Sequence, residues 1–96
     1  MITIFDKKGF NALAKLELDS LREADLSQRD LSEANLVAVD LRGANLQGCK
    51  LCHADLRLAD LRGANLHQAD LTGADLSGAQ LDNAVVTRAV LPIKAV

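Results

Sequence analysis

Cysteine and histidine are the residues of this chain whose types and spacing are most often linked to metal or redox chemistry. Cys49 and Cys52 are separated by two residues, and this C-x-x-C spacing occurs in zinc sites and in redox-active proteins. His53 follows directly, and His67 is the second histidine of the chain. Whether these side chains can act together depends on the elements that carry them.

A leucine stands at every fifth position from Leu16 to Leu81, and Val86 and Leu91 continue the series in apolar form. A five-residue step turns an α-helix by a net angle of about 140°, so the leucines would scatter around it. A flat strand would put successive leucines on opposite faces. The pattern therefore predicts a chain that turns every five residues, with four sides making a square coil of roughly twenty residues.

The residues around each leucine repeat as well. A small residue usually stands two positions before the leucine and Asp or Asn one position before it, as in Ala44-Asn45-Leu46. This A-(D/N)-L-X-X pattern resembles the pentapeptide-repeat family. The resemblance implies an all-β fold, a right-handed quadrilateral β-helix in which the leucine and the small residue point inward. We expect an N-terminal cap (1–13), a β-helix of about four coils (14–91) and a C-terminal tail (92–96).

Glycine placement agrees with corners at fixed positions. Five glycines, among them Gly43, stand two positions after the leucine, where a turn with positive φ favours glycine. Corners that lack glycine there, such as those at Glu33, Ala38 and Leu58, are expected to use another turn type.

The first residues lie outside the repeat and are expected to cover the N-terminal end of the coil, because repeat proteins need terminal segments that differ from the consensus. We expect a strand over Met1–Phe5, a turn at Asp6–Gly9 and a short helix over Phe10–Leu18. Phe5 and Phe10 would then plug the mouth of the coil.

The repeat also decides how the cysteines are interpreted. Cys49 takes the inward small position and Cys52 an outward one, so their side chains are expected to point apart. His53 and His67 fall on different walls. We therefore expect no metal site, no cofactor and two free thiols, as in a reducing compartment.

One wall, read at a step of roughly twenty residues, carries Arg22, Arg42 and Arg62, with Asp40 and Asp60 beside them. Two interpretations are open. The side chains form either a solvated ladder of salt bridges, which contributes little to stability, or a strip that binds anions.

Outward apolar residues mark a first candidate interface, since a contiguous exposed apolar patch often serves in recognition. Leu18, Ala38 and Leu58 form one column, with Val37 beside them. The alternative is that the N-terminal segment folds over part of this column, Leu18 above all.

The C-terminal end is a second candidate interface. Val85 and Val90 occupy positions where Asp or Asn is usual, and Ile93 adds to the apolar character. This end either associates with another molecule or is covered by the final residues. The resemblance tilts the expectation towards a homodimer, because dimeric pentapeptide-repeat proteins associate through their C-terminal ends.

Two charged residues do not fit the repeat. Asp19 and Arg29 both occupy the inward small position, where an unpaired charge is costly. One hypothesis is an ion pair between them across the N-terminal mouth. The other is an irregular first coil from which Arg29 turns outward.

Composition limits the function classes. Eleven basic and thirteen acidic residues give a net charge of −2, which is no electrostatic footprint for direct nucleic-acid binding. No apolar run is long enough to cross a membrane, and no secretory signal is visible, so we expect a cytoplasmic protein.

No nucleophile with a base and an orienting group is recognisable, so an enzyme is not expected. The leading hypothesis is a non-enzymatic structural or protein-interaction module with an unidentified protein partner. The alternative comes from the resemblance, because some family members mimic DNA and bind DNA gyrase or another DNA-binding protein. Mimicry of that kind requires a long, strongly acidic rod, and Arg22, Arg42 and Arg62 interrupt the acidic surface.

Overall fold

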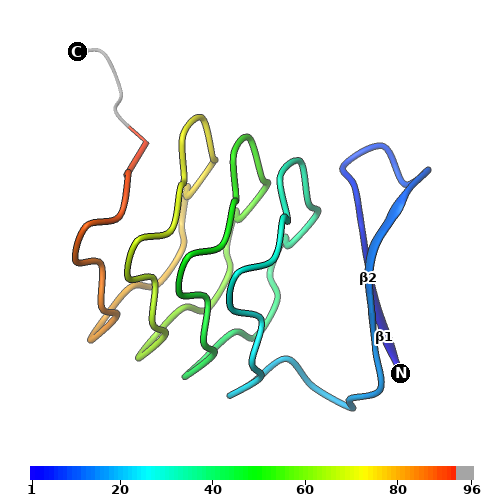
Figure 1. Cartoon of the computed structure of the whole chain (residues 1–96), viewed down its shortest axis with the longest axis horizontal. Coiled ribbons are helices and arrows are strands. Elements are labelled where there is room, and N and C mark those ends of the chain that lie inside the picture. Colours follow the sequence, from blue (N-terminus) through cyan, green and yellow to red (C-terminus); the bar gives the residue numbers. More distant parts are fainter. Residues whose placement is uncertain (93–96) are drawn as a thin grey trace.

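The computed structural model describes residues 1–92 as a hairpin followed by a stack of square coils (Figure 1). Strands β1 (Ile2–Phe5) and β2 (Ala12–Leu16) pair antiparallel and lie at the N-terminal end of the stack. No α-helix occurs in this part of the chain. The all-β fold class predicted from the sequence is therefore confirmed.

Within residues 1–92 the coils are joined by ten parallel bridges, and each bridge links residues that are twenty positions apart, from Asp25–Asn45 to Asp70–Val90. Typical ladder bonds are Leu46 N–H to the Asn65 carbonyl at 2.8 Å and Asn65 N–H to the Ala44 carbonyl at 2.9 Å. This spacing confirms the predicted twenty-residue coil.

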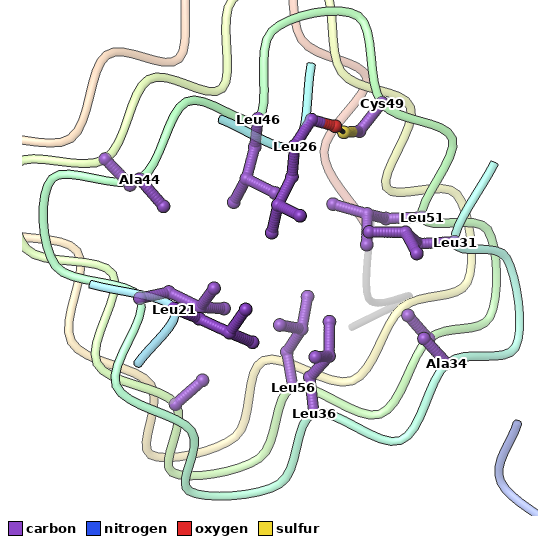
Figure 2. Packing of buried hydrophobic residues seen from close by; sticks show 14 of the residues in the cluster. Leu21, Leu26, Leu31, Ala34, Leu36, Ala44, Leu46, Cys49, Leu51 and Leu56 are labelled. Carbon is purple, nitrogen blue, oxygen red and sulfur yellow. Dashed lines mark hydrogen bonds between the residues drawn. The ribbon is translucent and has the colours of Figure 1, made fainter. Parts of the chain in front are cut away.

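The core is a column of inward leucines with small residues at the corners between them (Figure 2). Leu26, Leu46 and Leu66 stack on one side of the square, and all three are fully buried. Burying one leucine side chain contributes about 2 kcal/mol, so the column is the main source of stability. In the described residues no charged or polar residue is buried.

Every corner from Glu23 to Arg88 has a positive φ at the same position, so the prediction of another turn type at corners without glycine was wrong. The residue two positions after the leucine has a positive φ whether or not it is glycine, including Glu33 (66°), Ala38 (59°) and Leu58 (61°). The turn at Leu58 is closed by a hydrogen bond from Ala59 N–H to the Leu56 carbonyl. Each side of the coil must return its leucine to the central axis. The ladder therefore imposes a left-handed backbone conformation on the corner residue, despite the steric cost.

The Asp or Asn before each leucine has a structural role that the sequence pattern did not reveal. Its Oδ1 accepts a hydrogen bond from the backbone N–H two residues later, at 3.0–3.2 Å. Such Asx turns fix the chain as it enters a corner. The positions are Asp25, Asp30, Asn35, Asp40, Asn45, Asp55, Asp60, Asn65, Asp70 and Asp75.

The N-terminal segment is a hairpin, so the strand at the start was predicted correctly and the helix over Phe10–Leu18 was wrong. Pairing with β1 overrides the helix propensity of this Ala-, Leu- and Lys-containing segment. Phe5 accepts a hydrogen bond from Asn35 N–H, and Lys7 N–H donates to the Glu33 carbonyl, both at 2.8 Å. The predicted boundary at residue 13 falls inside β2.

The aromatic plug was also wrong. Phe5 is 45% exposed and Phe10 is 83% exposed, whereas Ile4, Ala14 and Leu16 are buried against the first coil. Residues of a strand alternate between faces. Ile4 pairs with Ala14 on the inner face, which leaves Phe5 on the outer face.

Asp19 and Arg29 are both exposed, and no ion pair joins them in the described residues. The hypothesis of a pair across the N-terminal mouth is therefore wrong. The hairpin already covers that mouth with apolar side chains, so a charged pair there would lose its hydration.

Replacing Ala38 by Gly tests the strain at the corners. Ala38 has a φ of 59°, and glycine adopts this conformation without a steric penalty. We expect Ala38→Gly to raise the free energy of unfolding by about 0.5–1 kcal/mol in urea denaturation. The matched control is Ala59→Gly, at a buried inward position without positive φ, which should lose about 1 kcal/mol. A loss of stability in Ala38→Gly would contradict this account.

Acid should weaken the Asx turns that are built on aspartate. Hydrogen bonds from the hydroxyls of Ser27, Thr72 and Ser77, and then from their backbone N–H groups, lower the pKa of Asp25, Asp70 and Asp75 below the ordinary value of 3.8. A folded pKa below the unfolded one stabilises the protein above the unfolded pKa, and this stabilisation is lost as the pH falls through the folded pKa.

Changing these three aspartates together to Asn keeps the acceptor oxygen but removes the titration. We expect near-normal stability at neutral pH and a shallower loss of the urea midpoint below about pH 4 than in the unaltered protein. The corresponding Ala variant should be less stable at every pH. An Asn variant that loses stability as steeply as the unaltered protein would refute the role of these carboxylates.

Candidate interaction surfaces

The two cysteines lie on opposite sides of the backbone, as the repeat predicts. Cys49 is fully buried and its thiol donates to the Leu26 carbonyl at 2.8 Å (Figure 2). Cys52 is partly exposed, and both thiols are free. Burial raises the pKa of each thiol, which disfavours the reactive thiolate. Within residues 1–92 no cluster of His, Cys, Asp and Glu has the geometry to hold a metal ion.

On the wall of Arg22, Arg42 and Arg62, two of the three guanidinium groups are held by carboxylates. Arg42 donates to Asp40 through two nitrogens at 2.9 and 2.8 Å, and Arg62 binds Asp60 in the same way at 2.8 and 2.6 Å. These hydrogen bonds hold the pKa of Asp40 and Asp60 well below its usual range. Arg42 also approaches Asp60 of the next coil at 3.7 Å, so the pairs form a ladder.

Arg22 differs because Ser20, and not an aspartate, precedes it by two residues. Among residues 1–92 Arg22 has no ion pair. Anion binding by the three arginines stays a prediction. Arg42 and Arg62 would have to leave their carboxylates to take part.

The predicted column of outward apolar residues is present at Ala38 and Leu58 but does not extend to Leu18. Leu58 is 63% exposed, and its side chain lies over Gly78 of the next coil, where an added Cβ would come within 2.7 Å of a Leu58 methyl carbon. Val37 is half-buried nearby, and Ala38 is exposed. No bridge joins the segment of Leu18 to the coil below it in the described residues, so Leu18 lies outside the ladder.

The last coil presents the largest group of exposed apolar side chains. Leu81, Val85, Val86, Val90 and Leu91 are each 36–53% exposed. With the half-buried Leu76, we call this group the C-terminal face. Three of its members, Leu76, Leu81 and Leu91, line a hollow of about 370 Å³ at the end of the leucine column. The predicted interface residue Ile93 lies outside the described residues.

The polar side chains of the walls form repeating rows, and their polar groups make hydrogen bonds within and between coils. His67 Nδ1 lies 2.6 Å from the Thr87 hydroxyl twenty residues later, and the aspartates bind the turns. No helix of residues 1–92 has the length and apolar character needed to cross a membrane.

Comparison with known proteins gives one family. The model for pentapeptide repeats matches residues 20–57 and 54–88, more than half of the chain. A comparison with curated proteins found no match.

Solved structures of pentapeptide-repeat proteins are similar as well. Rfr23 from the cyanobacterium Cyanothece 51142 is 36% identical, with a TM-score of 0.62 over 72% of this chain and 54% of that one. HetL from Nostoc sp. strain PCC 7120, which is involved in heterocyst differentiation regulation, is 34% identical, with a TM-score of 0.50 over 75% of this chain and 40% of that one. This chain thus spans about half the length of these two proteins or less.

The family match, the twenty-residue coil and the similarity to Rfr23 agree on the architecture, which is a right-handed quadrilateral β-helix. The chain belongs to the pentapeptide-repeat family.

Proposed function

We propose that this protein is a non-enzymatic structural and protein-interaction module, which associates with a second copy of itself through the C-terminal face. The observation that carries the proposal is the contrast between the two ends of the rod. The hairpin covers the N-terminal end, where Leu21 is 4% exposed, whereas Leu81 at the other end is 36% exposed.

Backbone groups point to the same surface. Within the described residues, the N–H groups of Leu81 and Val86 have no hydrogen-bond partner, although Leu61 and Leu66 one coil earlier donate to Gln80 and Val85. Such an unpaired edge beside apolar side chains favours association with another coil. A self-complementary contact about a two-fold axis closes after two copies, so a dimer is the simplest assembly.

The regulatory involvement of HetL agrees with a binding role in place of catalysis. The alternative, mimicry of DNA towards gyrase or another DNA-binding protein, has less support. The Arg42–Asp40 and Arg62–Asp60 pairs cancel charge on two successive coils of one wall. A cytoplasmic location is part of the proposal, because two free thiols suit a reducing compartment.

Substituting both Val85 and Val90 by Asp tests the interface with little risk to the fold. Both positions are exposed, and Asp at position 85 can form the Asx turn of other coils with the N–H of Thr87. Asp at position 90 would stay exposed without this bond, because Pro92 has no N–H. We expect the unaltered protein to have twice its chain mass of 10.3 kDa in sedimentation equilibrium, and the double variant to have the monomer mass. Four buried carboxylates in one dimer interface would cost far more than the contact gains.

Phe10→Glu is the matched control, because Phe10 is exposed and apolar but lies between β1 and β2, at the opposite end of the rod from the C-terminal face. It should leave the mass unchanged. A monomeric unaltered protein at about 100 μM, well above the dissociation constant of a stable dimer, would overturn the proposal, as would a dimeric Val85→Asp, Val90→Asp variant.

A further inference from the structure

A second opening lies at the other end of the rod, between β1 and the first coil. The cavity measures about 230 Å³ and is lined by apolar side chains, Ile2, Leu36 and Val39 among them. Thr3 of β1 and Asp40 of the coil also line it. We call this opening the cap slot.

The cap slot exists because Asp19 does not enter the coil. In the repeat, residues 19 and 20 should lie over Val39 and Asp40 and pair with them, as Asp25 pairs with Asn45. Asp19 is exposed instead, and no bridge joins Ser20 to Asp40 in the described part of the chain. A carboxylate at the inward position would be buried without a partner, so this segment turns outward and leaves Val39 uncovered.

One edge of the cap slot carries ladder groups without partners. One coil further, Asp60 N–H donates to the Val39 carbonyl at 3.0 Å, and Leu41 N–H donates to the Asp60 carbonyl at 2.8 Å. The equivalent bonds of Asp40 would join it to Asp19 and Leu21. Neither bond occurs among the hydrogen bonds of residues 1–92, so the Asp40 N–H and C=O are free on this side.

The other edge is the outer side of β1. Asp6 N–H donates to Asn11 on the β2 side, whereas the Phe5 carbonyl accepts from Asn35 on the coil side. Backbone groups alternate in direction along a strand, so the N–H and C=O of Thr3 also point to the coil side. The hydrogen bonds between β1 and the coil stop at Asn35 and do not reach Thr3, because the coil turns away from β1 at its next corner.

We propose that the cap slot binds an extended peptide segment of a partner protein, which adds as a strand and inserts one uncharged aliphatic side chain. Free donors and acceptors on two facing edges match an extended backbone, and this mode of recognition is known as β-strand addition. The cavity is smaller than the roughly 300–1,000 Å³ of typical ligand pockets, and it suits a single side chain.

Charge supports the choice of an aliphatic side chain. Among the described residues that line the cap slot, Asp40 alone is charged, and Arg42 holds its carboxylate through two hydrogen bonds. Residues of β1 line the cap slot, and β1 lies at the opposite end of the rod from the last coil (Figure 1). The two sites are therefore independent, and failure of one proposal leaves the other standing.

The probe is the hexapeptide acetyl-Gly-Ala-Asn-Leu-Gln-Gly-amide, which has the sequence of residues 43–48 and thus of one coil side of this protein. It is titrated into the full ¹⁵N-labelled chain to about 10 mM, a range that covers weak binding. We expect the backbone amide signals of Thr3, Leu21 and Asp40 to shift together. Methylation of the leucine nitrogen in the peptide should weaken binding about fivefold, as one lost hydrogen bond would.

Asp19→Ala supplies the sharpest variant. Alanine is the usual residue at this inward position, so residues 19–21 can stack on Val39 and close the cap slot from within the chain. Peptide-induced shifts should disappear in Asp19→Ala. The control is Arg29→Ala, which also restores alanine at an inward position but does not border the cap slot, and which should bind as the unaltered protein does.

Three results would overturn the proposal. The first is an absence of shifts up to about 10 mM peptide, or shifts confined to the C-terminal coil. The second is equal binding of the methylated peptide. The third is an Asp19→Ala variant that is folded, as its amide spectrum would show, and still binds the peptide with unchanged affinity.

Discussion

The return of one leucine to the central axis every five residues is the constraint on which this structure depends. Leu46 is buried only because Leu26 and Leu66 lie twenty residues to either side, on the coils above and below. Each such stack requires a backbone ladder of the same spacing. The ladder in turn requires a corner after every leucine, and this requirement forces positive φ even on Leu58. The strained corners are thus a consequence of the core.

A stack of coils exposes leucines and unpaired backbone groups at its two ends, and the two ends of this protein differ in how these groups are covered. At the N-terminal end the β1–β2 hairpin buries Ile4 and Leu16 against the first coil. At the C-terminal face the leucine column emerges at Leu81 and Leu91, beside unpaired backbone groups. The walls between the ends are largely satisfied by their own Asx turns and Arg–Asp pairs. Both binding surfaces that we propose therefore lie at places where the repeat is interrupted.

The strict period allowed the coil, the inward and outward positions and the opposite orientations of Cys49 and Cys52 to be predicted from the sequence. The hairpin could not be predicted, because Ala14-Lys15-Leu16 is compatible with helix until its pairing with β1 is known. The positive φ at Ala38 was not predicted, because residue type indicates the backbone conformation only where the fold does not impose one. Asp19 was recognised as a misfit, but its consequence, an open slot over Val39, depends on how the chain leaves β2.

The most direct test of the twenty-residue period compares two deletions. Removing residues 41–60 joins Asp40 to Leu61 and keeps every later residue on its wall, whereas removing Gln47 alone shifts all later leucines out of register. Urea unfolding followed by circular dichroism should show a cooperative transition for the shorter protein, at a lower midpoint because one coil interface is lost. The single deletion should abolish cooperative unfolding. Equal tolerance of both deletions would contradict the account.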